Sequence, residues 1–219
     1  VGLGFASGPL IVFSDPDCYA EPGWLAALAR AHRETGAVIV GALACHGDSL
    51  WDHAIHLCKF SKWLPGGKRR PIDMGPTANL LIPRDLLAAT GDLAGEPLLG
   101  DVELSRAVLA RGVPLLFEPT AVVSHHHEQS VGSFWRERFH RGVLFGAMRA
   151  EWLGKPRCVG MLIASILPIR FLRIALLVAL QSARGGKLLL YAVTAPLVLG
   201  GHLASLLGEA KAYARAVFG

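Results

Sequence analysis

In the stretch Leu10-Ile11-Val12-Phe13-Ser14-Asp15-Pro16-Asp17, an apolar run of four residues leads directly into a polar turn. The run follows Gly8-Pro9 and predicts a short strand buried on both faces, as in a parallel sheet. A helix is expected after Pro22, and a second strand over residues 37–43. The inner face of that helix would carry Trp24, Leu25, Leu28 and Ala31. Strand, turn, helix and strand in this order indicate the α/β class.

The chain continues with shorter elements. A strand is expected at residues 79–83, helices at 84–89 and 101–111, and two short strands at 115–117 and 121–123, separated by Pro119. A longer helix is expected at 133–152. Residues 44–74 lack a clear period, and their basic and aromatic side chains fit either a membrane interface or a solvated loop.

The composition points to membrane contact. Charged residues make up 18% of the chain and hydrophobic residues 52%, whereas soluble domains are about one quarter charged. Leu188–Leu207 has 20 residues without a formal charge, which is long enough to span a bilayer. The segment Val159–Leu180 is interrupted by Pro168, Arg170 and Arg173, so we expect it to be interfacial, re-entrant or packed on the other segment.

The net charge of +5 is concentrated in residues 136–187, where ten Lys and Arg accompany only two acids. This distribution fits an anionic membrane surface or a phosphate-bearing substrate. No nucleic-acid-binding motif is recognisable, and nucleic acid is not an expected partner. The four cysteines match no zinc spacing and predict free thiols in a reducing compartment.

Asp15 and Asp17 are the first candidate site residues. They follow a strand directly, and ligands of open α/β sheets bind at the carboxyl ends of strands. Two carboxylates there suit Mg²⁺ or Mn²⁺ bridged to a diphosphate. The alternative is a plain polar turn, because Asp-Pro-Asp is also a good turn sequence.

Asp101, His125 and Arg138 are further candidates. Asp101 precedes a helix and could be a general base or only its N-cap. His125 is the first of three histidines after a strand and the best metal ligand among them, whereas His126 and His127 are read as surface residues. Arg138 lies among Trp135, Arg136 and Arg141, which could stabilise a diphosphate or bind lipid phosphates.

Several segments in this order resemble family 2 glycosyltransferases of the GT-A fold. Residues 2–18, with Asp15-Pro16-Asp17, resemble the stretch that ends in the family's D-x-D motif, and Glu21-Pro22-Gly23-Trp24-Leu25 continues the match. Pro76-Thr77-Ala78-Asn79-Leu80 is similar to the loop that faces donor sugar and acceptor. Gly100-Asp101-Val102-Glu103 resembles the E-D segment with the catalytic aspartate, although Gly100 stands where glutamate is usual. Val122-Val123-Ser124-His125 resembles the strand that ends in a metal-binding histidine.

Residues 134–139 are only loosely similar to the Q-x-x-R-W segment, which argues against processive polymer synthesis. The resemblance implies an α/β fold of GT-A type, Rossmann-like with a mostly parallel sheet, followed by C-terminal membrane helices. Residues 1–150 would form a partial catalytic domain, and residues 151–219 a membrane-associated helical region. The first nucleotide-binding strands would precede Val1, so we expect this fragment alone to be inactive.

The implied activity is inverting sugar transfer from a nucleotide-diphosphate sugar to a hydroxyl of a glycan or lipid-linked acceptor, in bacterial envelope or exopolysaccharide synthesis. Asp17 and His125 would bind Mg²⁺ or Mn²⁺, Asp101 would be the base, and Asp15, Asn79 and Arg138 would contact the donor. The enzyme would sit at the cytoplasmic membrane with its catalytic part in the cytosol. Alternatives are a degenerate membrane module without catalysis and a nucleotidyltransferase acting on nucleotide sugars.

Overall fold

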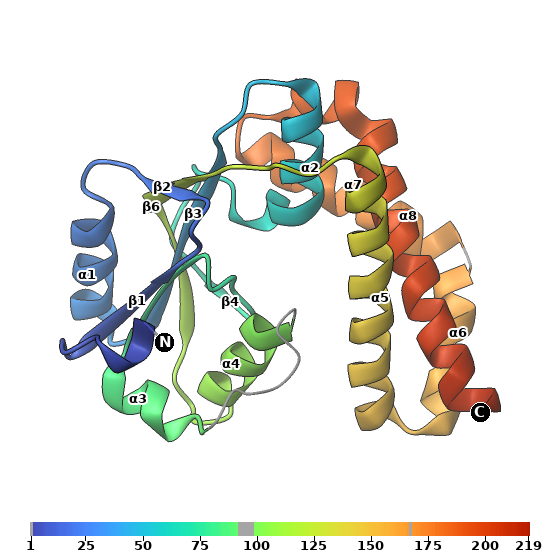
Figure 1. Ribbon diagram of the computed structural model, residues 1–219, viewed down its shortest axis with the longest axis horizontal. Helices are drawn as coiled ribbons and strands as arrows, with labels where there is room; N and C mark the ends of the chain where they lie inside the picture. The colour runs from blue at the N-terminus through green and yellow to red at the C-terminus, as the bar shows by residue number, and fades with distance from the viewer. Residues whose placement is uncertain (1, 92–98, 167) are drawn as a thin grey trace. The chain divides into compact units, whose positions relative to one another are not determined.

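The protein consists of two compact units. The computed structural model describes residues 2–91, 99–166 and 168–219. One unit comprises Val1–His46 and Trp63–His126, and the other comprises Gly47–Lys62 and His127–Gly219 (Figure 1). In this division His126 ends the first unit, and the segment after His46 belongs with the C-terminal helices.

The first unit is built on a six-stranded sheet. Its strand order is β1-β5-β3-β6-β2, and β4 pairs with β6. The helices of this unit are α1 (Trp24–Thr35), α3 (Arg84–Ala89) and α4 (Gly100–Leu109), with a 3₁₀ turn η1 at Gly2–Gly4. The strands are β1 (Leu10–Ser14), β2 (Cys18–Ala20), β3 (Val38–Cys45), β4 (Arg70–Ile72), β5 (Asn79–Pro83) and β6 (Leu115–His125).

The sheet is mixed, which corrects the expectation of a mostly parallel one. Among the described strands only β3 and β6 pair in parallel, whereas the pairings β1–β5, β3–β5, β2–β6 and β4–β6 are antiparallel. The apolar run of β1 suggested a central parallel strand, but β1 lies at the end of the strand order and only Ile11 in it is buried. An apolar run reports burial and does not encode the direction of the neighbouring strand.

Helix α1 covers the sheet with a narrow face of small residues. Ala27, Leu28 and Ala31 are buried in a cluster with residues of β3, β5 and β6. Leu25, which was expected on this inner face, is 55% exposed. Gly36 ends the helix in the left-handed conformation with φ 67°, a conformation that glycine adopts without strain.

Strand β6 is a single strand of 11 residues with an irregularity, not two strands broken at Pro119. Its pairing with β3 runs from Gly41 opposite Glu118 to Ala42 opposite Val122. The three residues between Glu118 and Val122 therefore form a bulge. Pro119 falls within this bulge. Because the bulge lies outside the regular β3–β6 pairing, the missing N–H of proline removes no hydrogen bond of the ladder.

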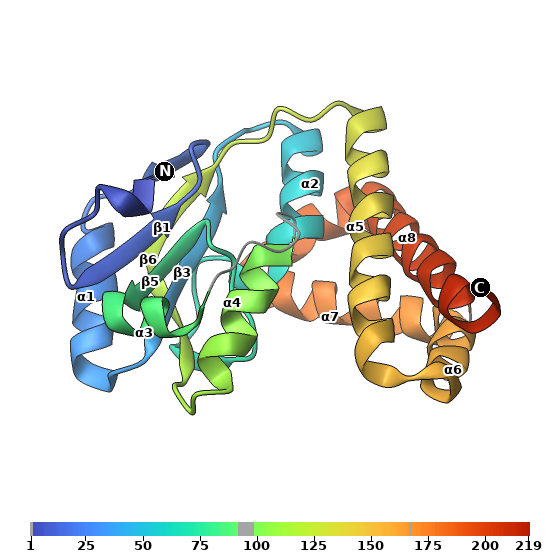
Figure 2. The same ribbon diagram turned by 60° about the horizontal axis from the view of Figure 1, so that its bottom comes forward.

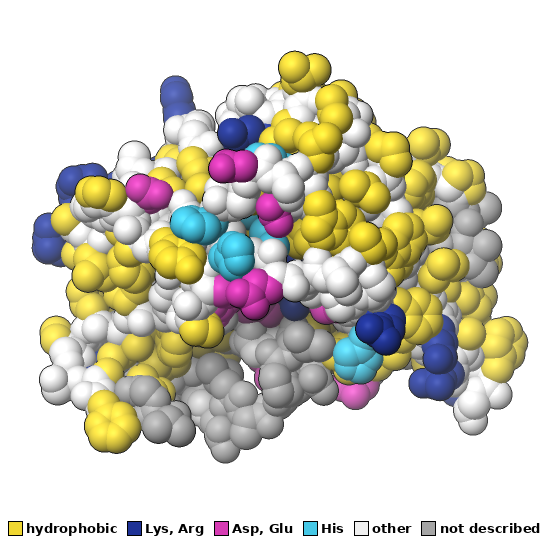
Figure 3. Space-filling model, turned by 45° about the horizontal axis from the view of Figure 1, so that its top comes forward, with side chains coloured by type: hydrophobic (Ala, Val, Ile, Leu, Met, Phe, Trp, Pro, Cys, Tyr) yellow, Lys and Arg dark blue, Asp and Glu magenta, His cyan; other side chains and the backbone are white. Residues whose placement is uncertain are grey.

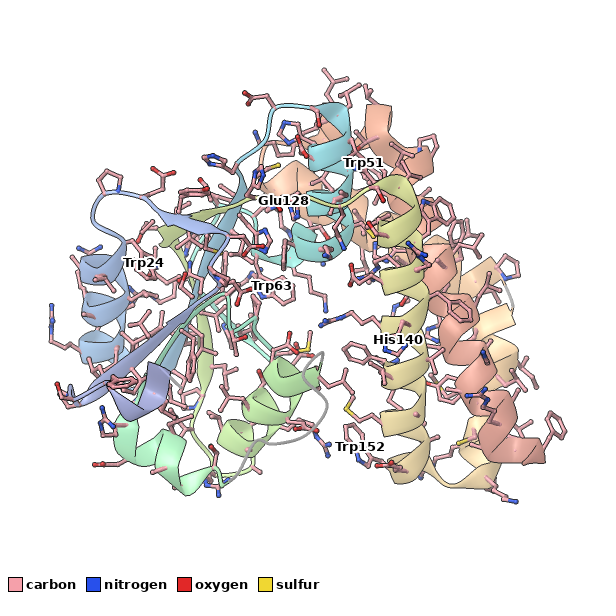
Figure 4. The ribbon with its side chains drawn as sticks, viewed as in Figure 1. Trp24, Trp51, Trp63, Glu128, His140 and Trp152 are labelled. Carbon is pink, nitrogen blue, oxygen red and sulfur yellow. The ribbon has the colours of Figure 1, made fainter. Side chains whose placement is uncertain are left out.

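Asn79 holds the sheet together at this bulge. Its amide nitrogen donates to the carbonyl oxygens of Ala42 and Ala121, both at 2.9 Å, and its amide oxygen accepts from the indole N–H of Trp24 at 2.8 Å. Trp24 lies on α1 (Figure 4). A Cβ on Gly41 would come within 2.2 Å of the amide nitrogen, so glycine is required there. One fully buried side chain thus links β5, β3, β6 and α1.

We predict that Asn79→Ala destabilises the protein by roughly 3–5 kcal/mol, because it leaves two buried carbonyls and an indole N–H without partners. Asp73→Ala is the control, since Asp73 is exposed, and is expected to change stability by less than about 0.5 kcal/mol. Urea unfolding followed by tryptophan fluorescence measures both. Equal midpoints for the two variants would contradict the structural role of Asn79.

The second unit is helical, and α8 is its central element. It contains α2 (Leu50–Phe60), the 3₁₀ turn η2 (Ser61–Trp63, which ends in the first unit), α5 (Val131–Leu153), α6 (Lys155–Ile166), α7 (Pro168–Arg184) and α8 (Leu188–Phe218). Helices α2, α5, α6 and α7 all contact α8. Leu167, within the expected apolar segment Val159–Leu180, lies outside the described residues.

Helix α2 was not expected from the sequence. Ser49 accepts a hydrogen bond from the backbone N–H of Asp52, and the Asp52 carboxylate accepts in return from the N–H of Ser49. This capping box satisfies donors at the helix start. The helix buries Ala54, Ile55 and Leu57, so residues 50–60 are not a solvated loop.

Glycines let α5 and α8 approach backbone to backbone. A Cβ on Gly142 would stand 2.1 Å from the carbonyl oxygen of Ser205, and one on Gly208 would stand 2.1 Å from that of Phe139. A Cβ on Gly146 would stand 2.7 Å from Ala212. A Cβ on Gly201 would meet Phe134 and one on Gly146 would meet Ala212, so the contacts advance along both helices and the two run in the same direction (Figures 1 and 2). Small residues at such contacts are typical of membrane helices.

Helix α8 is long and apolar enough to cross a membrane, judged by length and composition alone. In its most apolar window 28% of the residues are buried within the protein. The segments Lys155–Ser165 and Pro168–Arg184 meet the same criterion only when taken together. The expected apolar segment Leu188–Leu207 is therefore the first two thirds of a longer helix that reaches Phe218.

We predict that Gly142→Leu destabilises the second unit by about 2–3 kcal/mol, because the side chain would force α5 and α8 apart. Gly132→Leu on the same helix is the matched control, since nothing lies within 4 Å of a Cβ built there. Thermal unfolding in detergent should show a midpoint lowered by roughly 5–10 °C for the first variant alone. An unchanged midpoint for Gly142→Leu would show that the helices do not pack this closely.

Candidate metal centre

A tight turn and a short strand bring Asp17 to His125. The N–H of Cys18 donates to the carbonyl of Asp15 at 3.1 Å, with Pro16 at the second position, as in a β-turn. β2 then pairs with the end of β6, with Cys18 opposite His125. The N–H of His126 donates to the carbonyl of Asp17 at 2.9 Å. The polar-turn reading is thus correct, and β2 lies beside the end of β6 (Figure 1). The same turn presents the carboxylate of Asp17 to His125.

His125 is oriented as a metal ligand would be. Its Nδ1 lies 2.7 Å from the carbonyl oxygen of His126 and must donate to it, because a carbonyl only accepts. In the neutral ring Nε2 then carries the lone pair, and it lies 3.6 Å from Oδ2 of Asp17. A backbone carbonyl that fixes the tautomer in this way is the usual support of a metal-bound histidine.

A divalent cation fits between the two groups. The side chain of His125 is 9% exposed and that of Asp17 is 46% exposed. Oδ1 of Asp17 is buried and has no hydrogen-bond partner among the described residues. A buried carboxylate oxygen without a partner is costly, and a cation shared with the Nε2 lone pair would satisfy both. The donor set of one carboxylate and one imidazole suits Mn²⁺ or Mg²⁺ with further positions left for phosphate and water.

Cys18 is the third member of the group of possible ligands that contains this pair. Asp17, Cys18 and His125 each offer a potential ligand atom, and these atoms lie within 4.8 Å of one another. Partial burial, followed by the negative charges of Asp15 and Asp17, raises the pKa of the Cys18 thiol to about 11. The thiol therefore stays protonated at neutral pH and is a poor ligand for a hard cation.

Asp15 lies close enough to Cys18 for its charge to raise the pKa of that thiol. It is partly buried at the end of β1, where Ser14 pairs with Asn79 of β5. Asp15 and Asp17 therefore place two negative charges around one turn. Asp15 is not among the grouped ligand atoms of the described residues, which leaves Asp17 as the carboxylate that faces His125.

Asp101 lies in the first turn of α4 and is not its N-cap, because the helix begins at Gly100 with Leu99 in the cap position. A carboxylate oxygen of Asp101 accepts the N–H of Val102 at 2.9 Å. The partial positive charge of the helix N-terminus favours the ionised carboxylate. Asp101 belongs to neither group of clustered ligand atoms in the described part of the chain, so a role as base stays a prediction.

Asn79 has a structural role in place of the predicted donor contact. Both of its N–H groups and its oxygen are engaged by Ala42, Ala121 and Trp24, and the residue is 0% exposed. No polar atom of the side chain faces a ligand. The resemblance of residues 76–80 to a substrate loop therefore does not extend to this side chain.

Arg138 belongs to the second unit, whereas the other predicted site residues belong to the first. It lies on α5, where its charge acts on Cys58 of α2 and His202 of α8. Its neighbour Glu137 is an ion-pair partner of Lys59 at 3.0 Å. Burial raises the pKa of the Glu137 carboxyl, but the charges of Lys59 and Arg138 lower it by more. The pKa therefore lies below its usual value. A contact of Arg138 with a diphosphate stays a prediction.

Sequence reasoning missed an aromatic cluster beside the pair. Tyr19 stacks on His46 with ring centroids 4.3 Å apart, and His46 meets His126 edge-on at 5.7 Å. Tyr19 is 55% exposed. On the face drawn in Figure 3, histidine and acidic side chains lie next to one another. Tyr19 and His46 come from separate strands, β2 and the end of β3, and only the pairing of both with β6 brings them together.

A second histidine pair was also missed. His56 of α2 and His127 are buried and lie 3.1 Å apart between Nδ1 and Nε2, so one ring donates to the other. His127 is therefore a core residue and not the surface residue that was expected. In α2, His56 stands between the apolar residues Ile55 and Leu57, and all three are buried. The apolar neighbours of His56 were the sequence signal for its burial.

Comparison with known proteins identifies no relative: no protein-family model matches the chain, and no curated protein matches it.

We predict that the chain binds Mn²⁺ and that Asp17→Asn and His125→Ala each weaken this binding at least about tenfold, equivalent to about 1.4 kcal/mol. His126→Ala is the matched control, because His126 is the next residue and belongs to neither group of clustered ligand atoms. Its effect should stay below about threefold. Electron paramagnetic resonance of free Mn²⁺ measures the dissociation constants. Equal Mn²⁺ affinities of the unaltered protein and the three variants would rule out this centre.

Proposed function

We propose that the protein is an inverting glycosyltransferase that uses a nucleotide-diphosphate sugar and a divalent metal. The observation that carries the proposal is the Asp17–His125 pair, with Nε2 and Oδ2 3.6 Å apart at the carboxyl end of β6. The tautomer of His125 and the orphaned Oδ1 of Asp17 both fit a cation there. The order of Asp15-Pro16-Asp17, Asp101 and His125 in the sequence agrees with a GT-A enzyme.

The metal and the carboxylates have different roles in the proposed reaction. A Mg²⁺ or Mn²⁺ ion held by Asp17 and His125 would supply positive charge to the leaving nucleoside diphosphate. Asp15 would contact the ribose of the donor or the metal. Tyr19 and His46 offer flat, exposed faces next to the pair.

Asp101 takes the proton from the acceptor hydroxyl, whose oxygen attacks the anomeric carbon as the bond to the diphosphate breaks. A single displacement inverts the anomeric configuration. Asp101 lies in the first turn of α4. Gly100 provides no side chain to support it.

The proposed setting is the cytosolic face of the bacterial cytoplasmic membrane, in envelope or exopolysaccharide synthesis. Support comes from the apolar helix α8 and the basic segment 136–187. The acceptor would be a glycan or a lipid-linked saccharide. Free cysteines in the first unit, Cys18 and Cys45, agree with a reducing compartment.

We predict that Asp101→Asn abolishes transfer, with a loss of roughly 100-fold or more in rate, while Mn²⁺ binding is unchanged. Asparagine can still accept the N–H of Val102 through its amide oxygen, so the start of α4 is preserved. Glu103→Gln in the same turn is the control and should retain activity.

The assay uses the gene expressed with any coding sequence upstream of Val1 retained, and follows transfer from a panel of labelled nucleotide sugars to membrane extracts. Release of a nucleoside diphosphate is expected. Release of pyrophosphate would identify a nucleotidyltransferase. Activity of Asp101→Asn near that of the unaltered protein would remove Asp101 as the base, and binding of nucleotide sugar without turnover would indicate a non-catalytic module.

A further inference from the structure

The second unit carries two exposed apolar rows. On α7 the row consists of Ile169, Leu172, Leu176 and Leu180, which are 71%, 61%, 60% and 46% exposed. On α8 it consists of Leu189, Val193, Leu203 and Leu207, which are 80%, 57%, 45% and 54% exposed. Each set follows the spacing of one helix face. Hydrophobic side chains also gather in Figure 3 over the part of the surface that the second unit's helices form.

The opposite faces of these helices are already fixed within the unit. Gln181 of α7 accepts a hydrogen bond from Ser61 at 2.8 Å, and Tyr191 of α8 donates to the carbonyl of Ala175 at 3.1 Å. Arg170 of α7 pairs with Glu209 of α8 at 2.6 Å, and Arg149 of α5 pairs with the same carboxylate at 2.8 Å. The apolar rows therefore face away from the helices that hold α7 and α8 in place.

The charge around the rows is of one sign. Residues 152–208 contain no Asp or Glu, but they contain Lys155, Arg157, Arg170, Arg173, Arg184 and Lys187. All of these except Arg170 are exposed. Arg173 stands within the apolar row of α7, one turn after Ile169 and just before Leu176. An exposed arginine among leucines fits the headgroup region, where its chain can lie along apolar surface and its charge can reach phosphate.

The packing of α5 against α8 argues against a transmembrane orientation of α8. Within residues 188–207, α8 lies against the first half of α5 through Gly200, Gly201 and Ser205. That half of α5 exposes Arg136 and His140, and Figure 4 shows His140 on α5. If residues 188–207 crossed the hydrocarbon, these side chains would be carried toward it, and charges there are costly.

We propose that the second unit binds the surface of an anionic bilayer in plane, with α7 and α8 lying in the headgroup region of one leaflet and neither helix crossing it. The apolar rows enter the boundary of the acyl chains, and Arg173, Arg184 and Lys187 meet lipid phosphates. The charged face of α5 remains in water. The inference shares the membrane setting of the proposed function but does not depend on sugar transfer, so the two can fail separately.

Topology is tested by single cysteines in a protein whose partly exposed Cys18 and Cys45 are replaced by serine. Ala183→Cys and Phe218→Cys place exposed thiols at the end of α7 and near the end of α8. In intact spheroplasts an impermeant maleimide is expected to label neither, and after lysis both, with the protein in the membrane fraction. Labelling of Phe218→Cys or of Ala183→Cys from outside would overturn the proposal, as would recovery of the protein in the soluble fraction.

Lipid contact is tested with vesicles of phosphatidylglycerol or phosphatidylcholine. Leu176→Glu should lower binding of the purified protein to phosphatidylglycerol vesicles about tenfold, because it removes buried apolar area and adds like charge. Leu25→Glu, on α1 and 55% exposed, is the matched control and should leave binding unchanged. Equal binding of both variants, or equal binding to the two lipids, would overturn the proposal. Loss of transfer with normal vesicle binding would instead count against the enzyme assignment.

Discussion

The first unit depends on the side chain of Asn79, which satisfies three buried polar groups from three other elements. Its amide nitrogen bridges the carbonyls of Ala42 and Ala121 at the bulge of β6, and its oxygen holds Trp24 of α1. Such groups cannot stay unpaired in a dry core. The bulge exists because this one amide can close it, and Gly41 is needed because any Cβ would occupy the place of the amide.

The bulge in turn determines which residue of β6 lies opposite Cys45 and Cys18 at the end of the sheet. Beyond it the register of β6 places His125 opposite Cys45 on one side and opposite Cys18 on the other. The turn at Asp15–Cys18 then has one carboxylate, Asp17, within reach of the histidine ring. A slip of one residue would turn His125 to the other face of the sheet. The pair at the candidate centre is thus a consequence of the register of β6, which the hydrogen bonds of Asn79 hold at the bulge.

The sequence indicated most elements but little of their pairing. β1, α1, β3, α3, α4 and α5 follow from apolar period, proline and glycine, and their structural bounds differ from the expected ones by a few residues. The antiparallel neighbours of β5 could not be foreseen, because apolar runs report burial and not direction. Asp17 and His125 were found through their positions after strands. Tyr19 and His46 were not, because their contact arises only when both strands join β6.

Asn79 shows that a resemblance to a motif does not fix what its side chain contacts. A polar residue after Thr77-Ala78 reads as a ligand-facing loop, yet its side chain points into the sheet and is fully buried. The same ambiguity applies to α8, whose composition alone suggests a lipid-exposed span. Gly142 and Gly208 bring the charged helix α5 into backbone contact with it, and a helix joined to such a neighbour must be placed together with that neighbour. Composition describes a helix singly, whereas the glycine contacts show that α5 and α8 form one packed unit.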